Sequence, residues 1–418
     1  MAHSERKTAA LFKQVLAQQQ AGDIAATIDL LEKLLRLNAR HLDANYMLGT
    51  LYAERGDLQL AAKYLLSAMN IAPLSHLVHN NLGNVYRLQK NFERATQHYK
   101  RALQIQPNLP EAYFNMGNIH EILDRRNEAA DCYLQAIQLD PQFTNAHFKL
   151  GKAYLAAEEY SDARQCFQNV LALNPQYAHI HFYLGVCYTR LNEREAALLH
   201  LNKHLQSNSD DKSEAQLYLA YLNAAPIPDH YPVEEMKNTY KKRAATWDSD
   251  IEQPNKEFLG PQLIQRALVK MLPHTAPLDI LDIGCGTGLC GRFLRPLARR
   301  LDGVDLSEDM LQEAGKKQLY DHLICIDISE FMNQHPLDYD LIIGSGVLIL
   351  IGDLRPVFQA AAEALRPGGQ FIFTLYSSET EPVVVRENMH FAHSHTHIVE
   401  RAAEAGLAVV SIEAVIHE

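Results

Sequence analysis

The sequence has little that points to a membrane, an extracellular compartment or a polyanionic partner. None of its apolar runs is long enough to span a bilayer. The polar start, MAHSERKTAALFKQ, lacks the apolar core of a signal peptide. Acidic residues outnumber basic ones by 50 to 39, and the net charge of -11 argues against broad binding to nucleic acid or anionic membranes. We therefore expect a cytoplasmic protein.

Cysteine is sparse, and its spacing is not that of a metal or disulfide framework. The six cysteines contain no Cys-x-x-Cys pair, so we expect neither a zinc site nor disulfides, but reduced and buried thiols. They are Cys132, Cys166, Cys187, Cys285, Cys290 and Cys325. The length of 418 residues leaves room for two to three domains of about 100–200 residues each.

The first half of the sequence repeats every 34 residues. Glycine recurs at this step, an apolar residue precedes each glycine, and alanine follows twelve residues later. The glycines are Gly49, Gly83, Gly117, Gly151 and Gly185. Small residues at fixed positions are needed where two helices of a unit cross closely, and each unit buries its apolar face only against its neighbours. This predicts an array of helix pairs.

The repeat is similar to the tetratricopeptide repeat. We count six units over about residues 8–211, followed by a capping helix, which gives an all-α superhelical domain over residues 8–224. The resemblance implies that two positions of each first helix face a groove that binds a protein or an extended peptide. In the middle units these are Asn81, Asn84, Asn115, Asn118, Lys149 and Lys152. A solvated polar face without a ligand is the alternative.

The proline-rich segment PIPDHYP, residues 226–232, ends the helical pattern and predicts a domain boundary. From residue 233 to 418, strand and helix patterns alternate, which is typical of a doubly wound α/β sheet. The expected strands are 279–283, 301–305, 322–326, 339–343 and 370–376, with helices over 260–272 and 289–300 among the connections.

The first of these strands ends in LDIGCGTG, a strand followed by a glycine turn and a helix, as nucleotide-like ligands require. Two ligand classes compete here. Gly286, Gly288 and Gly291 spell the dinucleotide fingerprint G-x-G-x-x-G, with Asp305 near the distance of a ribose-binding acid. Asp282, however, would repel a pyrophosphate and attract an ammonium or sulfonium group, which favours S-adenosylmethionine.

Five motifs in this order resemble those of the class I S-adenosylmethionine-dependent methyltransferases. They are LDIGCGTG, GVDLS, CIDIS, YDLIIG and LRPGG. The resemblance implies a Rossmann-like sheet in which the glycine loop packs on the cofactor, Asp305 binds the ribose hydroxyls and Asp327 holds the adenine. The implied cofactor-binding residues are Asp282, Gly284, Cys285, Gly286, Gly288, Asp305, Leu306, Asp327 and Ile328. Cys285 is expected to be a small packing residue.

The same resemblance gives a role to the helix that follows the boundary. In such enzymes its aromatic residues close over the cofactor, so Tyr240 and Trp247 are expected to cover the pocket. An ordinary amphipathic helix packed on the sheet is the alternative.

No catalytic residue is evident, because the Asn-Pro-Pro-Tyr signature of amino-group methyltransferases is absent after strand 339–343. His393, in HFAHSHTH, is a candidate base or substrate-pocket residue, and we expect no metal site there. The segment LAVVSIEAVIHE, residues 407–418, is expected to form a sixth strand. The usual fold has seven, so the sheet closes differently, a partner supplies the edge, or the domain is shortened by its last strand.

These patterns predict a methyltransferase that uses S-adenosylmethionine and acts on an oxygen, nitrogen or sulfur nucleophile. The acceptor is a protein recruited by the repeats or a small molecule. Two other hypotheses remain. The chain could be a non-catalytic scaffold with a degenerate cofactor domain, or an NAD-dependent enzyme that uses the overlapping G-x-G-x-x-G.

Overall fold

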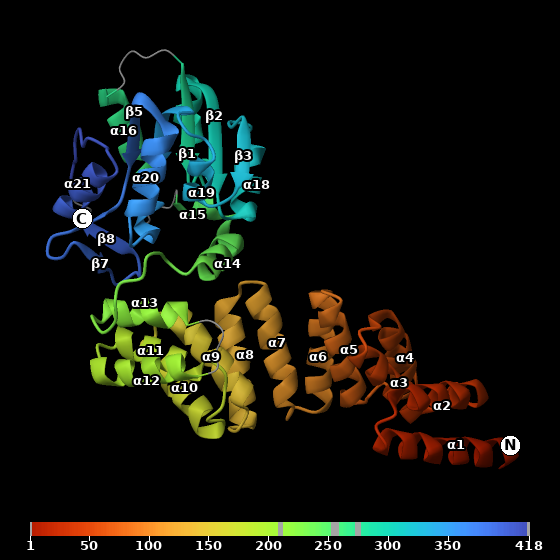
Figure 1. The fold of residues 1–418 in the computed structure, drawn as a ribbon. Coiled ribbons are helices and arrows are strands. Elements are labelled where there is room, and N and C mark those ends of the chain that lie inside the picture. The colour runs from red at the N-terminus through yellow and green to blue at the C-terminus, as the bar shows by residue number, and fades with distance from the viewer. Residues whose placement is uncertain (1, 208–211, 252–258, 272–276, 416–418) are drawn as a thin grey trace. The chain divides into compact units, whose positions relative to one another are not determined.

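The computed structural model describes residues 2–207, 212–251, 259–271 and 277–415. The chain forms two compact units, Met1–Asn192 and Glu193–Glu418, and Figure 1 shows helices in the first and a sheet with flanking helices in the second. Among the described residues, none of the helices is long and apolar enough to cross a membrane.

The first unit is the repeat array, and its helices are consecutive antiparallel pairs with short turns. They are α1 (Ala2–Gln20), α2 (Ile24–Leu37), α3 (Leu42–Glu54), α4 (Leu58–Ile71), α5 (His76–Leu88), α6 (Phe92–Ile105), α7 (Pro110–Ile122), α8 (Arg126–Leu139), α9 (Thr144–Ala156), α10 (Tyr160–Leu173) and α11 (Ile180–Arg190). The second unit opens with α12 (Arg194–Gln206) and the predicted capping helix, α13 (Ser213–Tyr221).

Close contact between the two helices of a pair explains the repeated glycine. A Cβ built on Gly83 would lie 2.5 Å from Cε1 of Tyr99, and one on Gly117 would lie 2.6 Å from the same atom of Tyr133. Both tyrosine side chains are almost completely buried. Any larger residue would push the helices apart, so the period in the sequence reports a steric requirement of the fold.

The second unit contains a parallel sheet of five strands in the order β3-β2-β1-β4-β5. The strands are β1 (Leu278–Ile283), β2 (Ala298–Asp305), β3 (His322–Cys325), β4 (Tyr339–Gly344) and β5 (Leu365–Phe373). The associated helices are α14 (Val233–Arg243), α15 (Trp247–Ile251), α16 (Gly260–Met271), α17 (Gly291–Leu294), α18 (Glu308–Lys316), α19 (Ile328–Asn333), α20 (Arg355–Ala364) and α21 (His395–Glu404). Two 3-10 turns are η1 (Arg295–Leu297) and η2 (Leu348–Leu350). The predicted doubly wound α/β class is confirmed.

A second, smaller sheet follows β5. Its strands are β6 (Tyr376–Ser378), β7 (Val383–Val385) and β8 (Phe391–Ser394), in the order β6-β8-β7. The helix α13 packs on it, because Leu217 and Ala220 share an apolar cluster with Val385, Met389 and Phe391. The capping helix therefore belongs to the core of the second unit.

Two expected elements differ from the structure. The helix predicted over 289–300 is reduced to α17 and η1, since Ala298 is already extended and begins β2, which pairs in parallel with β1. Pairing with the neighbouring strand outweighs local helix propensity here. The strand predicted at the C-terminus is absent over residues 407–415, which are irregular, and residues 408–415 are exposed, with Val410 76% exposed. Alternating apolar residues favour a strand only where a free edge is available to pair with them. Residues 416–418 lie outside the described part.

Candidate functional site

The glycine loop is bonded to the end of β2, as adjacent parallel strands allow. The amide of Cys285 donates to the carbonyl of Val304 at 3.0 Å. Asp305 Oδ2 accepts from the amide of Gly286 at 2.9 Å, and its Oδ1 accepts from the amide of Ser307 at 2.8 Å. Each carboxylate oxygen has a second lone pair, so Asp305 can also accept hydrogen bonds from the hydroxyls of a ribose.

The three glycines of the loop have left-handed backbone torsions but different surroundings. A Cβ on Gly284 would lie 2.6 Å from Cβ of Val347, and one on Gly288 would lie 2.8 Å from the ring of Tyr320. A Cβ on Gly286 (φ +55) would meet nothing within 4 Å. Gly284 and Gly288 are thus required by protein packing, whereas Gly286 borders open space beside Asp305. This is the cradle that a close-packed cofactor needs, and the residues present fit S-adenosylmethionine.

One buried and one partly buried carboxyl group give this space its electrostatic character. Asp282 is 1% exposed and accepts a hydrogen bond from the Tyr320 hydroxyl at 2.7 Å. Burial raises the pKa of Asp282 to about 7, and the carboxylate of Asp305 adds to the rise. Burial also raises the pKa of Asp305. A cationic group in this space would lower the free-energy cost of ionising both carboxyl groups, whereas a pyrophosphate would increase that cost. The space therefore favours a sulfonium ligand over a dinucleotide.

The other predicted cofactor residues lie on the same edge of the sheet. Asp327 follows β3 and caps α19, with Oδ1 accepting from the amides of Ser329 and Glu330 at 2.9 and 3.0 Å. Leu306 directly follows Asp305, and Ile328 directly follows Asp327. Burial raises the pKa of the Cys285 thiol well above its usual range, which suits a packing residue better than a nucleophile.

The helices α14 and α15 bring Tyr240 and Trp247 together. Their rings meet edge to face with centroids 5.4 Å apart, and the guanidinium of Arg243 lies 4.7 Å from the Trp247 ring. Burial raises the pKa of the Tyr240 hydroxyl to about 12, and the negative charge of Asp305 adds to the rise. Tyr240 therefore lies near the acid that is expected to hold the ribose.

A contact that the sequence did not reveal anchors these helices to the glycine loop. Asp248, next to Trp247, accepts a hydrogen bond from the Thr287 hydroxyl at 2.5 Å and pairs with Lys317 at 2.5 Å. Asp248 and Thr287 are 39 residues apart and follow no local pattern, so no spacing rule could have joined them. The only hint in the sequence was the tryptophan beside Asp248.

A further group of aromatic side chains lies at the small sheet. Tyr376 stacks on His390 with centroids 6.1 Å apart, and the Arg386 guanidinium lies 4.6 Å from the Tyr376 ring. Tyr231 meets His390 edge-on at 6.3 Å. Tyr376 is also among the groups that raise the pKa of Tyr240, after burial and Asp305.

His393 has no exposed surface, and its Nε2 lies 2.9 Å from the carbonyl oxygen of Ile351. Burial lowers the pKa of His393 to about 4. It stacks on His397 at 5.6 Å. The ring of His393 thus contacts the segment after β4, and its burial gives no support to a role as a general base. Among the described residues, no group of three or more His, Cys, Asp or Glu side chains could hold a metal ion.

The proline-rich linker is bonded to the same segment after β4. The amide of Tyr231 donates to the carbonyl of Leu350 at 2.8 Å, and the amides of Gly352 and Asp353 both donate to the carbonyl of Asp229, at 2.7 and 2.9 Å. A Cβ on Gly352 would collide with the carbonyl oxygen of Pro228. Backbone hydrogen bonds therefore hold residues 228–231 against residues 350–353.

In the repeat array, the predicted groove asparagines bond to one another and to tyrosines. The Asn81 amide donates to the Tyr46 hydroxyl at 2.9 Å. Asn84 Oδ1 accepts from Tyr99 at 2.7 Å and from Asn115 at 3.0 Å. These amides are half-buried, so part of their bonding capacity already serves the array.

The remaining groove residues are also engaged. Asn118 Oδ1 accepts from the Tyr133 hydroxyl at 3.0 Å, and Lys149 Nζ lies 2.7 Å from Glu121 Oε2. The ammonium of Lys152 lies 6.0 Å from the centroid of the Tyr183 ring. The pairing with Glu121 weakens the expectation that Lys149 favours acidic residues of a ligand.

Family models agree with both units. A methyltransferase-domain model matches residues 281–371. A TPR-repeat model matches residues 83–123 and 125–157, and a tetratricopeptide-repeat model matches residues 12–73 and 148–212.

Curated relatives are similar to a part of the chain. The malonyl-[acyl-carrier protein] O-methyltransferase of Priestia megaterium is 30% identical over 169 residues, 38% of this chain and 56% of that protein. The ubiquinone biosynthesis O-methyltransferase of Idiomarina loihiensis is 31% identical over 102 residues, 23% of this chain and 41% of that protein. The chain thus spans about half the length of the curated relatives it matches.

Among solved structures, that of Pseudomonas aeruginosa pilF is 20% identical, with a TM-score of 0.45 over 51% of this chain and 98% of that one. Together with the family models and the two folds, the curated relatives identify the parts of the molecule. The chain combines tetratricopeptide repeats with a C-terminal methyltransferase domain.

Proposed function

We propose that the second unit transfers a methyl group from S-adenosylmethionine to an oxygen nucleophile. The observation that carries this proposal is the open space beside Gly286, next to the buried carboxyl group of Asp282 and the partly buried one of Asp305. Adenine-containing ligands with a positive charge fit this space better than anionic ones. The choice of oxygen follows the relatives, which are named O-methyltransferases.

Each site residue has a distinct task in this proposal. S-adenosylmethionine, when bound, supplies an electrophilic methyl group on a sulfonium. Asp305 accepts hydrogen bonds from the ribose hydroxyls, Asp282 faces the charged methionine end, and Asp327 holds the adenine amino group. Tyr240 and Trp247 exclude water from the reacting side.

The site does not need a strong base if the acceptor is already ionised. A carboxylate or phenolate attacks without losing a proton, so that alignment and desolvation by the enclosing aromatic residues provide the acceleration. This agrees with the buried and internally bonded position of His393.

We further propose that the repeat array recruits a protein partner. Half-buried amides at a regular spacing offer donors and acceptors to an extended peptide backbone, as the predicted groove residues do. The array would then bring the acceptor, or its carrier, to the second unit.

Replacing Asp305 with alanine tests the cofactor assignment. We expect at least tenfold weaker binding of S-adenosylmethionine by calorimetry, because a hydrogen bond to a charged group contributes about 1.5–3 kcal/mol. Glu308→Ala is the matched control, since Glu308 is an exposed acid three residues further on. Equal affinity of the Asp305 variant and wild type, or tighter binding of NAD than of S-adenosylmethionine, would refute the assignment.

Turnover is tested separately, by mass spectrometry of lysate treated with the protein and an isotopically labelled methyl donor. Transfer of label by wild type and not by the Asp305 variant supports an enzyme. Binding without transfer would favour the scaffold hypothesis.

A further inference from the structure

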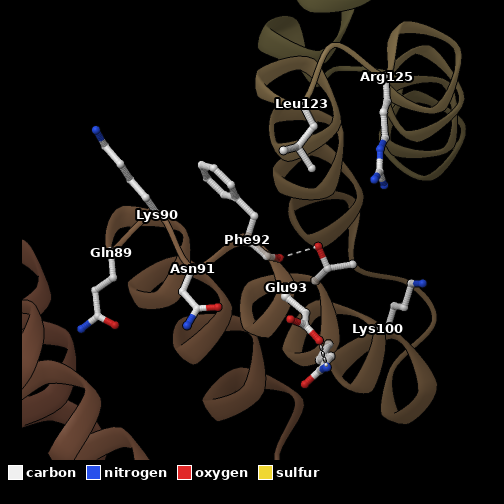
Figure 2. A pocket seen from close by; sticks show the side chains of 10 residues that line it. Gln89, Lys90, Asn91, Phe92, Glu93, Lys100, Leu123 and Arg125 are labelled. Atoms are coloured by element: carbon white, nitrogen blue, oxygen red, sulfur yellow. Dashed lines mark hydrogen bonds between the residues drawn. The ribbon is translucent and has the colours of Figure 1, made fainter.

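A cleft of about 820 Å³ lies in the repeat array, and none of the predicted groove residues lines it. It is formed by the turn between α5 and α6, by the exposed side of α6, and by the turn between α7 and α8. Its volume is in the range of small binding sites, about 300–1,000 Å³. Figure 2 shows Lys90, Phe92, Lys100, Leu123 and Arg125 around it.

The cations of this cleft lack acidic partners. Lys90, Lys100 and Arg125 are exposed, and none of them forms an ion pair with a residue that the structure describes. Elsewhere in the array Lys33, Arg36 and Arg55 each pair with an acid. The cleft contains one acid, Glu93, which accepts a hydrogen bond from Gln97. In a chain of net charge -11, this is a local positive patch that an anion would stabilise.

Comparison of equivalent positions shows that Arg125 is not required by the fold. The residue before the second helix of each pair is Asp23, Asp57, Asn91, Arg125, Glu159 and Glu193. Asp23 and Asn91 accept a hydrogen bond from the first turn, and Arg125 does not. A cation is unfavourable at the start of a helix, so Arg125 costs local stability. Residues that break a local rule are expected at functional sites.

Lys90 occupies a turn position whose left-handed backbone is common to the pairs. Its φ is 59, and the equivalent residues are Gly22, Gly56, Asp124, Glu158 and Asn192, all with positive φ. A residue other than glycine is strained there, but four of the six pairs accept this strain. Of the cations in the cleft, Arg125 is therefore the one that differs from the residues at its equivalent positions.

The cleft also has apolar side chains next to its cations. Leu123 is 42% exposed and Phe92 is partly buried against the core. Most amides around them are already bonded. Gln89 donates to Leu58, and Asn91 caps α6. What remains for a ligand is cationic and apolar.

We propose that this cleft docks an acidic segment of a partner protein that carries one large apolar side chain. The acidic residues contact Lys90, Lys100 and Arg125, and the apolar side chain packs between Phe92 and Leu123. The positive patch, opposed to the negative charge of the whole chain, is the reason for an acidic occupant. The site is separate from cofactor binding.

The probe for this proposal is a fluorescein-labelled peptide of glutamates around a central leucine. We expect it to bind the full chain, and to bind more weakly as salt increases. The variant K90S/K100S/R125S should weaken binding at least tenfold. The variant K33S/R36S/R55S changes the net charge by the same amount but removes paired cations, and it should bind like wild type.

The test also has an internal control for folding. Serine is a preferred residue at the start of a helix. Arg125→Ser alone should therefore raise the melting temperature of the protein while it weakens binding of the peptide. Equal binding by the two triple variants, or no binding by wild type, would overturn the proposal. So would unchanged affinity for a peptide with serine in place of leucine.

Two other occupants are distinguished by the same proteins. If a single-stranded oligonucleotide binds as tightly as the peptide and is lost in K90S/K100S/R125S, the cleft is a general polyanion site and the proposal fails. It also fails if wild type self-associates in sedimentation and this variant does not, because the occupant is then a second copy of the chain.

Discussion

At the scale of single residues, a carboxyl group buried beside the glycine loop lowers the stability of the folded chain. Asp282 is 1% exposed, and its hydrogen bond from Tyr320 does not compensate for burial, which raises its pKa from the usual 3.8 to about 7. The unfolded chain, with the ordinary pKa, loses this proton more easily than the folded protein. Between these two values the folded state holds the extra proton, so stability falls as pH rises.

Replacing Asp282 with asparagine should remove this pH dependence. The asparagine oxygen can still accept from Tyr320, and no charge is buried. Relative to the variant, ligand-free wild type should lose up to about 4 kcal/mol of unfolding free energy between pH 4 and 7, and no more above pH 7. Urea unfolding at several pH values measures the difference. If the unfolding free energies of wild type and variant differ by the same amount throughout this pH range, the folded state does not hold the extra proton on Asp282.

At the scale of elements, the first helices of neighbouring repeats are joined by polar side chains. Asn84 accepts hydrogen bonds from Tyr99 within its own repeat and from Asn115 of the next. The amides at the predicted groove positions therefore help to hold the array together.

Asn84→Ala should destabilise the array by about 1–3 kcal/mol, because the almost completely buried Tyr99 and the Asn115 amide both lose a partner. Asn81→Ala removes a single bond, to Tyr46, and should cost about 0.5–1.5 kcal/mol. Denaturant unfolding, followed by helix content, compares the two. Equal losses would show that the second hydrogen bond of Asn84 adds nothing to stability in solution.

Elements with a strict physical requirement could be predicted from the sequence, and others could not. The helix pairs were evident because glycine must recur where Tyr99 or Tyr133 crosses it. Asp305 and Asp327 were proposed as cofactor-binding residues from the family resemblance. Asp305 ends β2 and Asp327 follows β3, at one edge of the parallel sheet. The shortening of the helix after Gly291 depends on the pairing of β2 with β1, and the contact of Asp248 with Thr287 joins distant segments. Neither leaves a local pattern.

At the scale of the whole molecule, the proline-rich segment is more than a tether. The sequence suggested a boundary at residues 226–232, whereas the compact units divide between Asn192 and Glu193. The difference arises because α13 packs on the small sheet and the linker is bonded to residues 350–353. Proline and glycine content shows where helices end, but not what the intervening chain packs against.

Two glycine substitutions should therefore separate the units in one unfolding experiment. Gly352→Ala forces the linker away from residues 350–353, because its Cβ would collide with the Pro228 carbonyl. Gly83→Ala forces aside the ring of Tyr99, and such overpacking costs about 1–3 kcal/mol. In scanning calorimetry each variant should lower one of two transitions. S-adenosylmethionine should raise only the transition that Gly352→Ala lowers, since a ligand stabilises the unit that binds it. If both substitutions lower the same transition, or the cofactor raises both, the units unfold as one cooperative body and the linker does not belong to the second unit alone.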